Sequence, residues 1–401
     1  MSLKTNRDHR VSPIVESLPP SGIRKFFELV ANTKGVISLG IGEPDFVTPW
    51  HIREACLYSL EQGYTMYTSN SGLPELRSEI TKFLVRSYEL DYDYDKEIIV
   101  TIGASEAVDA ALRAIITPGD EVIIPEPSYV SYMPCAVLAG AEPIIVDTFA
   151  RDDFRLKPEH IERKITPKTK AIILCYPNNP TGAVMGREDL EEIAALAVEN
   201  DLIVISDEIY SELTYNGRHV SMASIPGMKE RTILVNGFSK AWAMTGWRIG
   251  FAAGPEDIIG AMVKIHQYTI LCAPVMAQMA ALEALKNGGD EVEKMVLQYD
   301  QRRRFVVNRL TEIGLDCFEP RGAFYAFPSV KITGMNSGEF AEELLREEKV
   351  AVVPGDAFGR AGEGFIRISY AASMKNLTKA MDKIEAFVGR RVKTVSNLCQ
   401  V

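Results

Sequence analysis

Seven short apolar runs rich in β-branched residues do most to restrict the fold of this 401-residue chain. They lie at residues 97–103, 121–127, 142–148, 171–177, 202–208, 232–238 and 248–254. Several are apolar throughout, as strands buried on both faces of a sheet are, and the amphipathic stretches between them have the length of crossover helices. We therefore predict a mostly parallel, seven-stranded α/β sheet flanked by helices, with ligands bound beyond the carboxyl ends of its strands.

The pattern changes after residue 255. It continues with a long helical stretch at residues 275–313, apolar runs at 323–330, 350–358 and 365–371, and a last helical stretch at 374–388. This order predicts a second, smaller α+β domain. We predict three segments: an N-terminal arm (residues 1–49) that packs on the small domain, a large domain (50–290) and a small C-terminal domain (291–401).

Composition argues against several classes of protein. The net charge is -10, from 44 Lys and Arg against 54 Asp and Glu, which disfavours a nucleic-acid partner. No apolar run approaches the roughly 18 residues that span a bilayer. The 6 cysteines and 5 histidines are scattered, without CxxC or HExxH spacing, so we expect neither a metal site nor a disulfide framework. These features lead us to expect a cytoplasmic protein without a membrane partner.

Chemically distinctive residues follow the ends of several apolar runs. Ala104 and Ser105 open a helix after the first run, where free backbone N–H groups can bind a phosphate, although many such turns bind nothing. The NNPTG turn at residues 178–182 aims amide side chains at the crevice, or is only a tight turn. Asp207 ends a buried run, where a carboxylate needs a cationic partner unless it caps a helix.

Two cations complete this set. Lys240 lies just beyond the sixth run in an apolar segment, and Arg248 follows eight residues later. A desolvated lysine near other cations has a lowered pKa and can act as an amine nucleophile. The alternative is an ordinary surface lysine, which is solvated and has no such role. A nucleophilic lysine, a carboxylate, amide donors and a phosphate cradle are what pyridoxal phosphate requires. The combination therefore predicts a pyridoxal-phosphate enzyme.

The chain resembles the class I aminotransferases, which are fold-type I pyridoxal-phosphate enzymes, from about residue 21 to residue 388. The resemblance rests on GEPDF (42–46), YTSNSGLPELR (67–77), NNPTG (178–182), SDEIY (206–210), SK with TGWRIG (239–250) and FIRISYA (365–371). It implies a homodimer with shared active sites. It also implies a ping-pong reaction that moves the amino group of an L-amino acid to a 2-oxo acid such as 2-oxoglutarate.

The resemblance further implies a role for individual residues. Lys240 would form the Schiff base and act as general base, and Asp207 would keep the pyridine nitrogen protonated. Asn179 and Tyr210 would contact the ring oxygen, and Tyr129 would stack on the ring. The other implied contacts are Ala104, Ser105, Ser239, Arg248 and Tyr67 of the partner subunit for the phosphate, and Arg367, Asn179 and the Gly42 backbone for the substrate α-carboxylate. The implied catalytic residues are Lys240, Asp207 and Tyr210.

Two positions depart from the family pattern. Gly237 stands where many relatives carry a phosphate-binding serine, so Ser239 or a water must compensate. Ser105 stands where some aspartate-preferring relatives carry a lysine. A buried acidic side chain needs a cation, so we expect aromatic or other large donors to be at least as good as aspartate. The side-chain pocket that we expect comprises Ile23, Phe26, Tyr129 and Tyr132. Either Arg24 or a bound water would allow 2-oxoglutarate to bind, and Arg24 is otherwise a solvated arginine at the start of a helix.

Two other functions stay open at this point. A β-elimination lyase on the same scaffold would share the early steps of transamination. A regulator would use the fold to bind an effector without catalysis. Such regulators add a DNA-binding domain, whereas this chain has fewer than 50 residues before GEPDF and is acidic.

Overall fold

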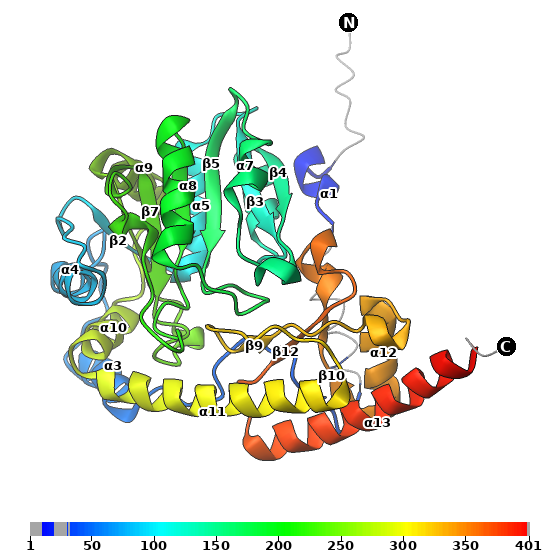
Figure 1. Cartoon of the computed structure of the whole chain (residues 1–401). Helices are drawn as coiled ribbons and strands as arrows, with labels where there is room; N and C mark the ends of the chain where they lie inside the picture. Colours follow the sequence, from blue (N-terminus) through cyan, green and yellow to red (C-terminus); the bar gives the residue numbers. More distant parts are fainter. Residues whose placement is uncertain (1–9, 20–29, 31–32, 399–401) are drawn as a thin grey trace, which may run out of the picture.

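The large sheet of the structure has the predicted architecture. The computed structural model describes residues 10–19, 30 and 33–398 (Figure 1). Its seven-stranded sheet has the order β2-β8-β7-β6-β5-β3-β4. The strands are β2 (Ile98–Thr101), β3 (Glu121–Glu126), β4 (Glu142–Asp147), β5 (Thr169–Cys175), β6 (Ile203–Asp207), β7 (Thr232–Gly237) and β8 (Gly250–Ala253). β8 runs opposite to the other six strands of this sheet, so the prediction of a mostly parallel α/β sheet is confirmed.

Helices cover both faces of this sheet (Figure 1). Successive strand residues point to opposite faces, so Ile172 packs under one layer of helices and Ile173 under the other. One layer contains α7 (Pro158–Glu162) and α8 (Arg187–Glu199). The other contains α5 (Gly103–Ile115), α6 (Tyr132–Ala139) and α9 (Glu256–Thr269). Burial on both faces explains why the strands are apolar throughout.

Near β2 and β8 the sheet packs on further helices. These are α3 (Trp50–Glu61), α4 (Pro74–Tyr88) and α10 (Val275–Asn287). The predicted helical stretch 275–313 is two helices, because the chain breaks at Gly288 before α11 (Gly289–Ile313). A Cβ on Gly288 would lie 2.6 Å from the Ala284 carbonyl oxygen and 2.9 Å from the Trp242 ring, so the close approach requires a glycine there.

The C-terminal part contains two small sheets. β11 (Val353–Pro354), β12 (Ile366–Ser369) and β9 (Tyr325–Ala326) form an antiparallel sheet. β1 (Ile37–Ser38) pairs in parallel with β10 (Val350–Ala351), which ties the N-terminal segment to this part. The helices here are α11, α12 (Ser337–Glu348) and α13 (Met374–Leu398), and a short helix, α1 (Pro13–Ser17), lies near the start of the chain. The smaller α+β unit agrees with the expected fold class, while the three segment boundaries stay a prediction.

The last helix is longer than the sequence indicates. We predict its end at residue 388, but α13 continues to Leu398. Arg391 on this extra length donates to Glu343 of α12 at 2.7 Å. This contact joins residues that are far apart in the sequence, which explains why the local pattern understates the helix.

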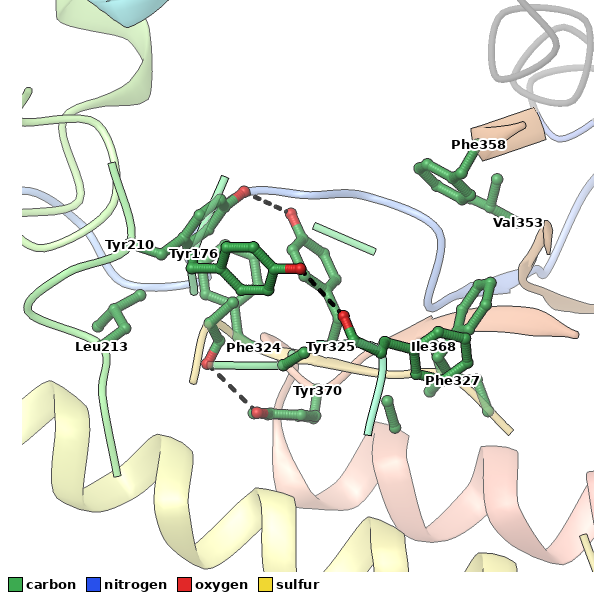
Figure 2. Close-up of a cluster of buried hydrophobic side chains, with 14 of the residues drawn as sticks. Tyr176, Tyr210, Leu213, Phe324, Tyr325, Phe327, Val353, Phe358, Ile368 and Tyr370 are labelled. Atoms are coloured by element: carbon green, nitrogen blue, oxygen red, sulfur yellow. Dashed lines mark hydrogen bonds between the residues drawn. The ribbon is translucent and has the colours of Figure 1, made fainter. Parts of the chain in front are cut away.

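Aromatic side chains join the large sheet to the C-terminal part (Figure 2). Tyr210, which follows β6, shares a hydrogen bond of 2.8 Å with Tyr325 of β9. Gly182, in the NNPTG turn, has φ +75° and accepts backbone hydrogen bonds from Arg321 and Gly322. A Cβ there would lie 2.4 Å from the Pro320 side chain, so this junction requires a glycine.

Two further features of the described residues concern partners. None of their helices is both long enough and apolar enough to cross a membrane. In the same part of the chain, no cluster of three or more His, Cys, Asp or Glu side chains is suited to hold a metal ion.

Candidate active site

A cavity of about 420 Å³ lies where the carboxyl ends of β5, β6 and β7 meet. Parallel strands end at one edge of a sheet, so the residues that follow them come together there. The first turn of α5 and the strands β9 and β12 complete the wall. Every predicted site residue except Tyr67 lines this cavity: Gly42, Ala104, Ser105, Tyr129, Asn179, Asp207, Tyr210, Ser239, Lys240, Arg248 and Arg367.

Lys240 is held as a half-buried amine. Its Nζ donates to the Gly42 carbonyl oxygen at 2.8 Å and lies 5.7 Å from the centre of the Tyr210 ring. Burial and the nearby Arg367 cation lower its pKa from 10.5 to about 8. The side chain therefore loses its proton more readily than an exposed lysine, which favours its use as a nucleophile or base.

Asp207 is a buried carboxylate at the end of β6. Tyr132 donates its hydroxyl to Oδ2 at 2.7 Å, and the Ile209 backbone donates to Oδ1 at 3.2 Å. Burial raises the pKa of Asp207 to about 6, while these two hydrogen bonds act in the opposite direction. The group is thus ionised at neutral pH, and because both donors are neutral, its charge can hold a protonated ligand atom.

Arg367 on β12 is only 3% exposed and has an open donor. It donates to the Asn179 side chain at 2.8 Å and to the Gly40 carbonyl oxygen at 2.6 Å. Its guanidinium lies 4.5 Å from the Tyr325 ring and 4.8 Å from the Phe358 ring. Its Nε is buried without a hydrogen-bond partner among the described residues. A buried cation with an open N–H is suited to bind a carboxylate.

The first residues of α5 allow a close approach of other groups. Gly103 has φ +74°, and a Cβ there would lie 2.6 Å from Nη2 of Arg248. Gly250 packs equally closely, since its Cβ would lie 2.8 Å from the Ala104 nitrogen. The guanidinium of Arg248 therefore meets the positive end of a helix, a combination that binds anions.

The structure explains the glycine at position 237. A Cβ on Gly237 would lie 2.9 Å from the Gly250 Cα and 3.1 Å from the Ile249 carbonyl oxygen. A serine there would require the two adjacent strands to separate. This position is therefore closed to the family's phosphate-binding serine, while Ser239 lines the cavity.

The NNPTG turn presents Asn179 by an internal network. The Asn178 side chain accepts from the Thr181 backbone at 3.1 Å and from the Thr181 hydroxyl at 2.8 Å. Hydrogen bonds of this kind replace the backbone pairing that ends with β5. Asn179 is thereby directed toward Arg367.

The sequence analysis does not identify several residues and contacts of the cavity. Tyr325 shares its hydroxyl with Tyr210 and stacks on Arg367, yet in the sequence it is one aromatic in an apolar run. Tyr132, expected as a wall of the side-chain pocket, lines the cavity and also donates its hydroxyl to Asp207, a contact that the sequence does not indicate. The other lining residues that the sequence does not indicate are Glu43, Val108, Ser131, Cys135, Cys175, Ile209 and Thr245. Glu43, Ile209 and Thr245 lie within the sequence motifs, whereas Val108 and Cys135 lie inside helices and carry no such signal.

Some predicted residues lie elsewhere. The Tyr67 side chain is 82% exposed and is not part of the cavity wall. Ile23, Arg24 and Phe26 lie outside the described residues.

We predict that the Lys240 amine titrates near pH 8 and that the substitution Arg367→Met raises this pKa toward 10.5, because it removes a neighbouring cation. The measurement is the rate of Lys240 acylation against pH, followed by mass spectrometry, in protein freed of small ligands. The exposed Lys264 in the same digest is the internal control. An unchanged Lys240 pKa in the variant would contradict the electrostatic account.

Comparison with known proteins identifies the family. The family model "Aminotransferase class I and II" matches residues 34–384. The putative aminotransferase YugH of Bacillus subtilis is 56% identical over 94% of this chain and 98% of its own length. An aspartate aminotransferase of Pyrococcus abyssi is 50% identical, with 94% and 97% covered. The crystal structure of an aromatic aminotransferase from Pyrococcus horikoshii OT3 is 48% identical, covers 92% of this chain and 99% of its own, and has a TM-score of 0.88. The chain therefore belongs to the class I and II aminotransferases, and it is a transaminase.

Proposed function

We propose that this enzyme uses pyridoxal 5′-phosphate to move the amino group of an L-amino acid to a 2-oxo acid such as 2-oxoglutarate by a ping-pong mechanism. One observation carries the proposal. A half-buried lysine with a lowered pKa, a buried carboxylate and a buried arginine with an open donor line one cavity. Each of these groups is costly to bury alone, and the three together match an amino acid and this cofactor.

The donor set supports the cofactor. Ala104, Ser105 and Arg248 would hold the phosphate, aided by Ser239, because they combine a helix N-terminus with a guanidinium. Asp207 would hold the pyridine nitrogen. Tyr129 would lie on the ring face, and Asn179 and Tyr210 would contact the ring oxygen. When bound, pyridoxal phosphate supplies an electron sink for the charge that develops at the substrate Cα.

The protein's own groups would then bind, orient and move protons. Arg367 would bind the substrate α-carboxylate with help from Asn179, which fixes the direction of the Cα–H bond. Lys240, with a pKa of about 8, would accept the Cα proton at Nζ and return it. Asp207, with a pKa of about 6, stays ionised at neutral pH and would hold a proton on the ring nitrogen.

The decisive experiment is an amino-donor panel with 2-oxoglutarate, applied to the wild type and to Lys240→Ala. We expect the variant to fold but to lose transamination by several orders of magnitude, because Lys240 is both the covalent partner and the proton carrier. Borohydride reduction of the wild type should fix the cofactor on Lys240. The surface variant Lys264→Ala is the matched control. A reduced adduct at another lysine would refute the assignment. Release of pyruvate and ammonia in the absence of any added 2-oxo acid would favour the lyase.

The cations of the cavity bear on the choice of donor. Among the described lining residues they are Lys240, Arg248 and Arg367, and the proposal assigns each of them to the cofactor or to the α-carboxylate. An acidic side chain would need a further cation, whereas Tyr129 and Tyr325 offer aromatic surface. We propose that aromatic or other large amino acids are at least as good donors as aspartate. Relatives named for aspartate and for aromatic substrates both occur.

Steady-state kcat/KM values for phenylalanine, tyrosine and aspartate, with 2-oxoglutarate as acceptor, test this proposal. We expect the aromatic donors to equal or exceed aspartate. Arg367→Lys is the control, because a point charge replaces a bidentate fork and should lower kcat/KM for every donor alike. A hundredfold advantage of aspartate, about 2.7 kcal/mol of transition-state binding, would mean that the pocket contains another cation.

An exposed apolar surface supports a homodimer. Met66, Tyr67 and Tyr268 are 80%, 82% and 86% exposed. Their segments adjoin, since Asn70 donates to the Leu271 carbonyl oxygen at 2.7 Å. Exposed apolar patches of this kind mark interaction surfaces. We propose that a second copy covers this surface and that Tyr67 of the partner subunit completes the phosphate site. A cytoplasmic location stays a prediction.

Mixing two variants, each of which lacks one residue of the proposed site, tests whether the site is shared. In a mixed dimer of Lys240→Ala and Tyr67→Ala chains, one site keeps both Lys240 and the partner's Tyr67. After dissociation and random reassociation, half of the dimers are mixed, and each mixed dimer has one intact site out of two. We therefore expect mixing to restore activity toward one quarter of the wild-type value. Each variant reassociated alone is the control. No restoration in demonstrably mixed dimers would place Tyr67 outside the neighbouring site.

A further inference from the structure

A buried acid–histidine pair lies directly behind the proposed phosphate turn. Glu106 is in the second half of the first turn of α5, and His266 is on α9. The His266 side chain is fully buried, and that of Glu106 is 14% exposed. Neither residue lines the cavity, and the mechanism above uses neither of them.

Both carboxylate oxygens of Glu106 are engaged. Oε2 accepts the backbone N–H of Ile102 at 2.5 Å, and Oε1 lies 2.5 Å from Nδ1 of His266. Ile102 is the N-cap of α5 and has no side chain that could cap the helix. Glu106 therefore curls back to satisfy a backbone donor just before Gly103, while it ties the same turn to α9.

The surroundings fix the direction of the hydrogen bond. Nε2 of His266 is buried and has no partner among the described residues. A proton on Nε2 would be a buried donor without an acceptor, which is costly. The proton consequently resides on Nδ1, and His266 donates to Glu106.

We propose that Glu106 and His266 are positioning residues that set the phosphate-binding turn, and thereby the enzyme's selectivity for a phosphorylated cofactor. This inference rests on the proposed function. Gly103 has no side chain and a left-handed backbone, so it cannot fix its own conformation. The Glu106 carboxylate accepts the backbone N–H of Ile102, the residue before Gly103, and His266 in turn fixes the carboxylate. The backbone N–H groups of Ala104 and Ser105 then keep their direction toward the anion.

The substitution Glu106→Gln separates this role from simple packing. Glutamine has the same shape but only one acceptor oxygen, so it cannot accept from both Ile102 and His266. His266→Phe keeps the bulk and loses the donor. His266→Asn is the conservative variant, because its amide nitrogen lies at nearly the same place along the side chain as Nδ1. Asp109→Asn is the matched control, since Asp109 forms a surface pair with Arg113 on the same helix.

The measurement is equilibrium dialysis of the full-length enzyme against two probes, pyridoxal phosphate and pyridoxal, which lacks the phosphate. We expect Glu106→Gln and His266→Phe to raise the Kd for pyridoxal phosphate about tenfold, or about 1.4 kcal/mol, with the Kd for pyridoxal unchanged. His266→Asn should recover most of the affinity, and Asp109→Asn should change neither value. A loss shared by both probes, which a purely structural role would give, would overturn the proposal.

Two further outcomes are distinguishable. If the wild type binds pyridoxal phosphate and both Glu106→Gln and His266→Phe bind it equally well, the positioning role is wrong and the proposed function stands. If the wild type binds neither probe, the cofactor assignment itself fails. Should Glu106→Gln not fold, the comparison of His266→Phe with His266→Asn still decides the question, because Glu106 is intact in both.

Discussion

The burial of one guanidinium organises this structure. Arg367 comes from the C-terminal sheet, yet it donates to Asn179, which follows a strand of the large sheet, and to the backbone of Gly40 in the N-terminal segment. A buried cation must satisfy its donors, so three distant parts of the chain are held around it. The aromatic junction between Tyr210 and Tyr325 lies against the same guanidinium. The cavity thus depends on how the two parts of the chain meet.

Burial shifts the pKa values of two groups in the cavity in opposite directions. It lowers the pKa of Lys240 to about 8 and raises that of Asp207 to about 6. Lys240 can therefore lose its proton near neutral pH, whereas Asp207 still keeps its charge there. One cause, the removal of water, favours the neutral form of each group, and the two pKa shifts differ in sign because the lysine is charged with its proton and the carboxyl without it.

The sequence predicts the sheet well because apolar runs report burial on both faces, which is a local property. It also indicates the residues that follow strands, such as Asp207 and Lys240, since the topology of parallel strands brings them to one edge. It does not indicate Tyr325 or the pair of Glu106 with His266, whose partners lie more than a hundred residues away. The sequence also understates the end of α13, where Arg391 contacts Glu343 of another helix. Contacts of this kind depend on the assembled fold and leave no periodic signal.

The single reversed strand has a consequence for the spacing of the cavity's charges. β8 starts at the edge where β2 and β7 end, so Gly250 pairs with both Thr101 and Gly237. The segment between β7 and β8 leaves the sheet and returns to it at the same edge. It delivers a lysine near its beginning and an arginine near its end, eight residues apart. The length of this segment therefore sets the distance between the amine of Lys240 and the guanidinium of Arg248. An insertion or deletion within it would change that distance while the sheet stayed intact.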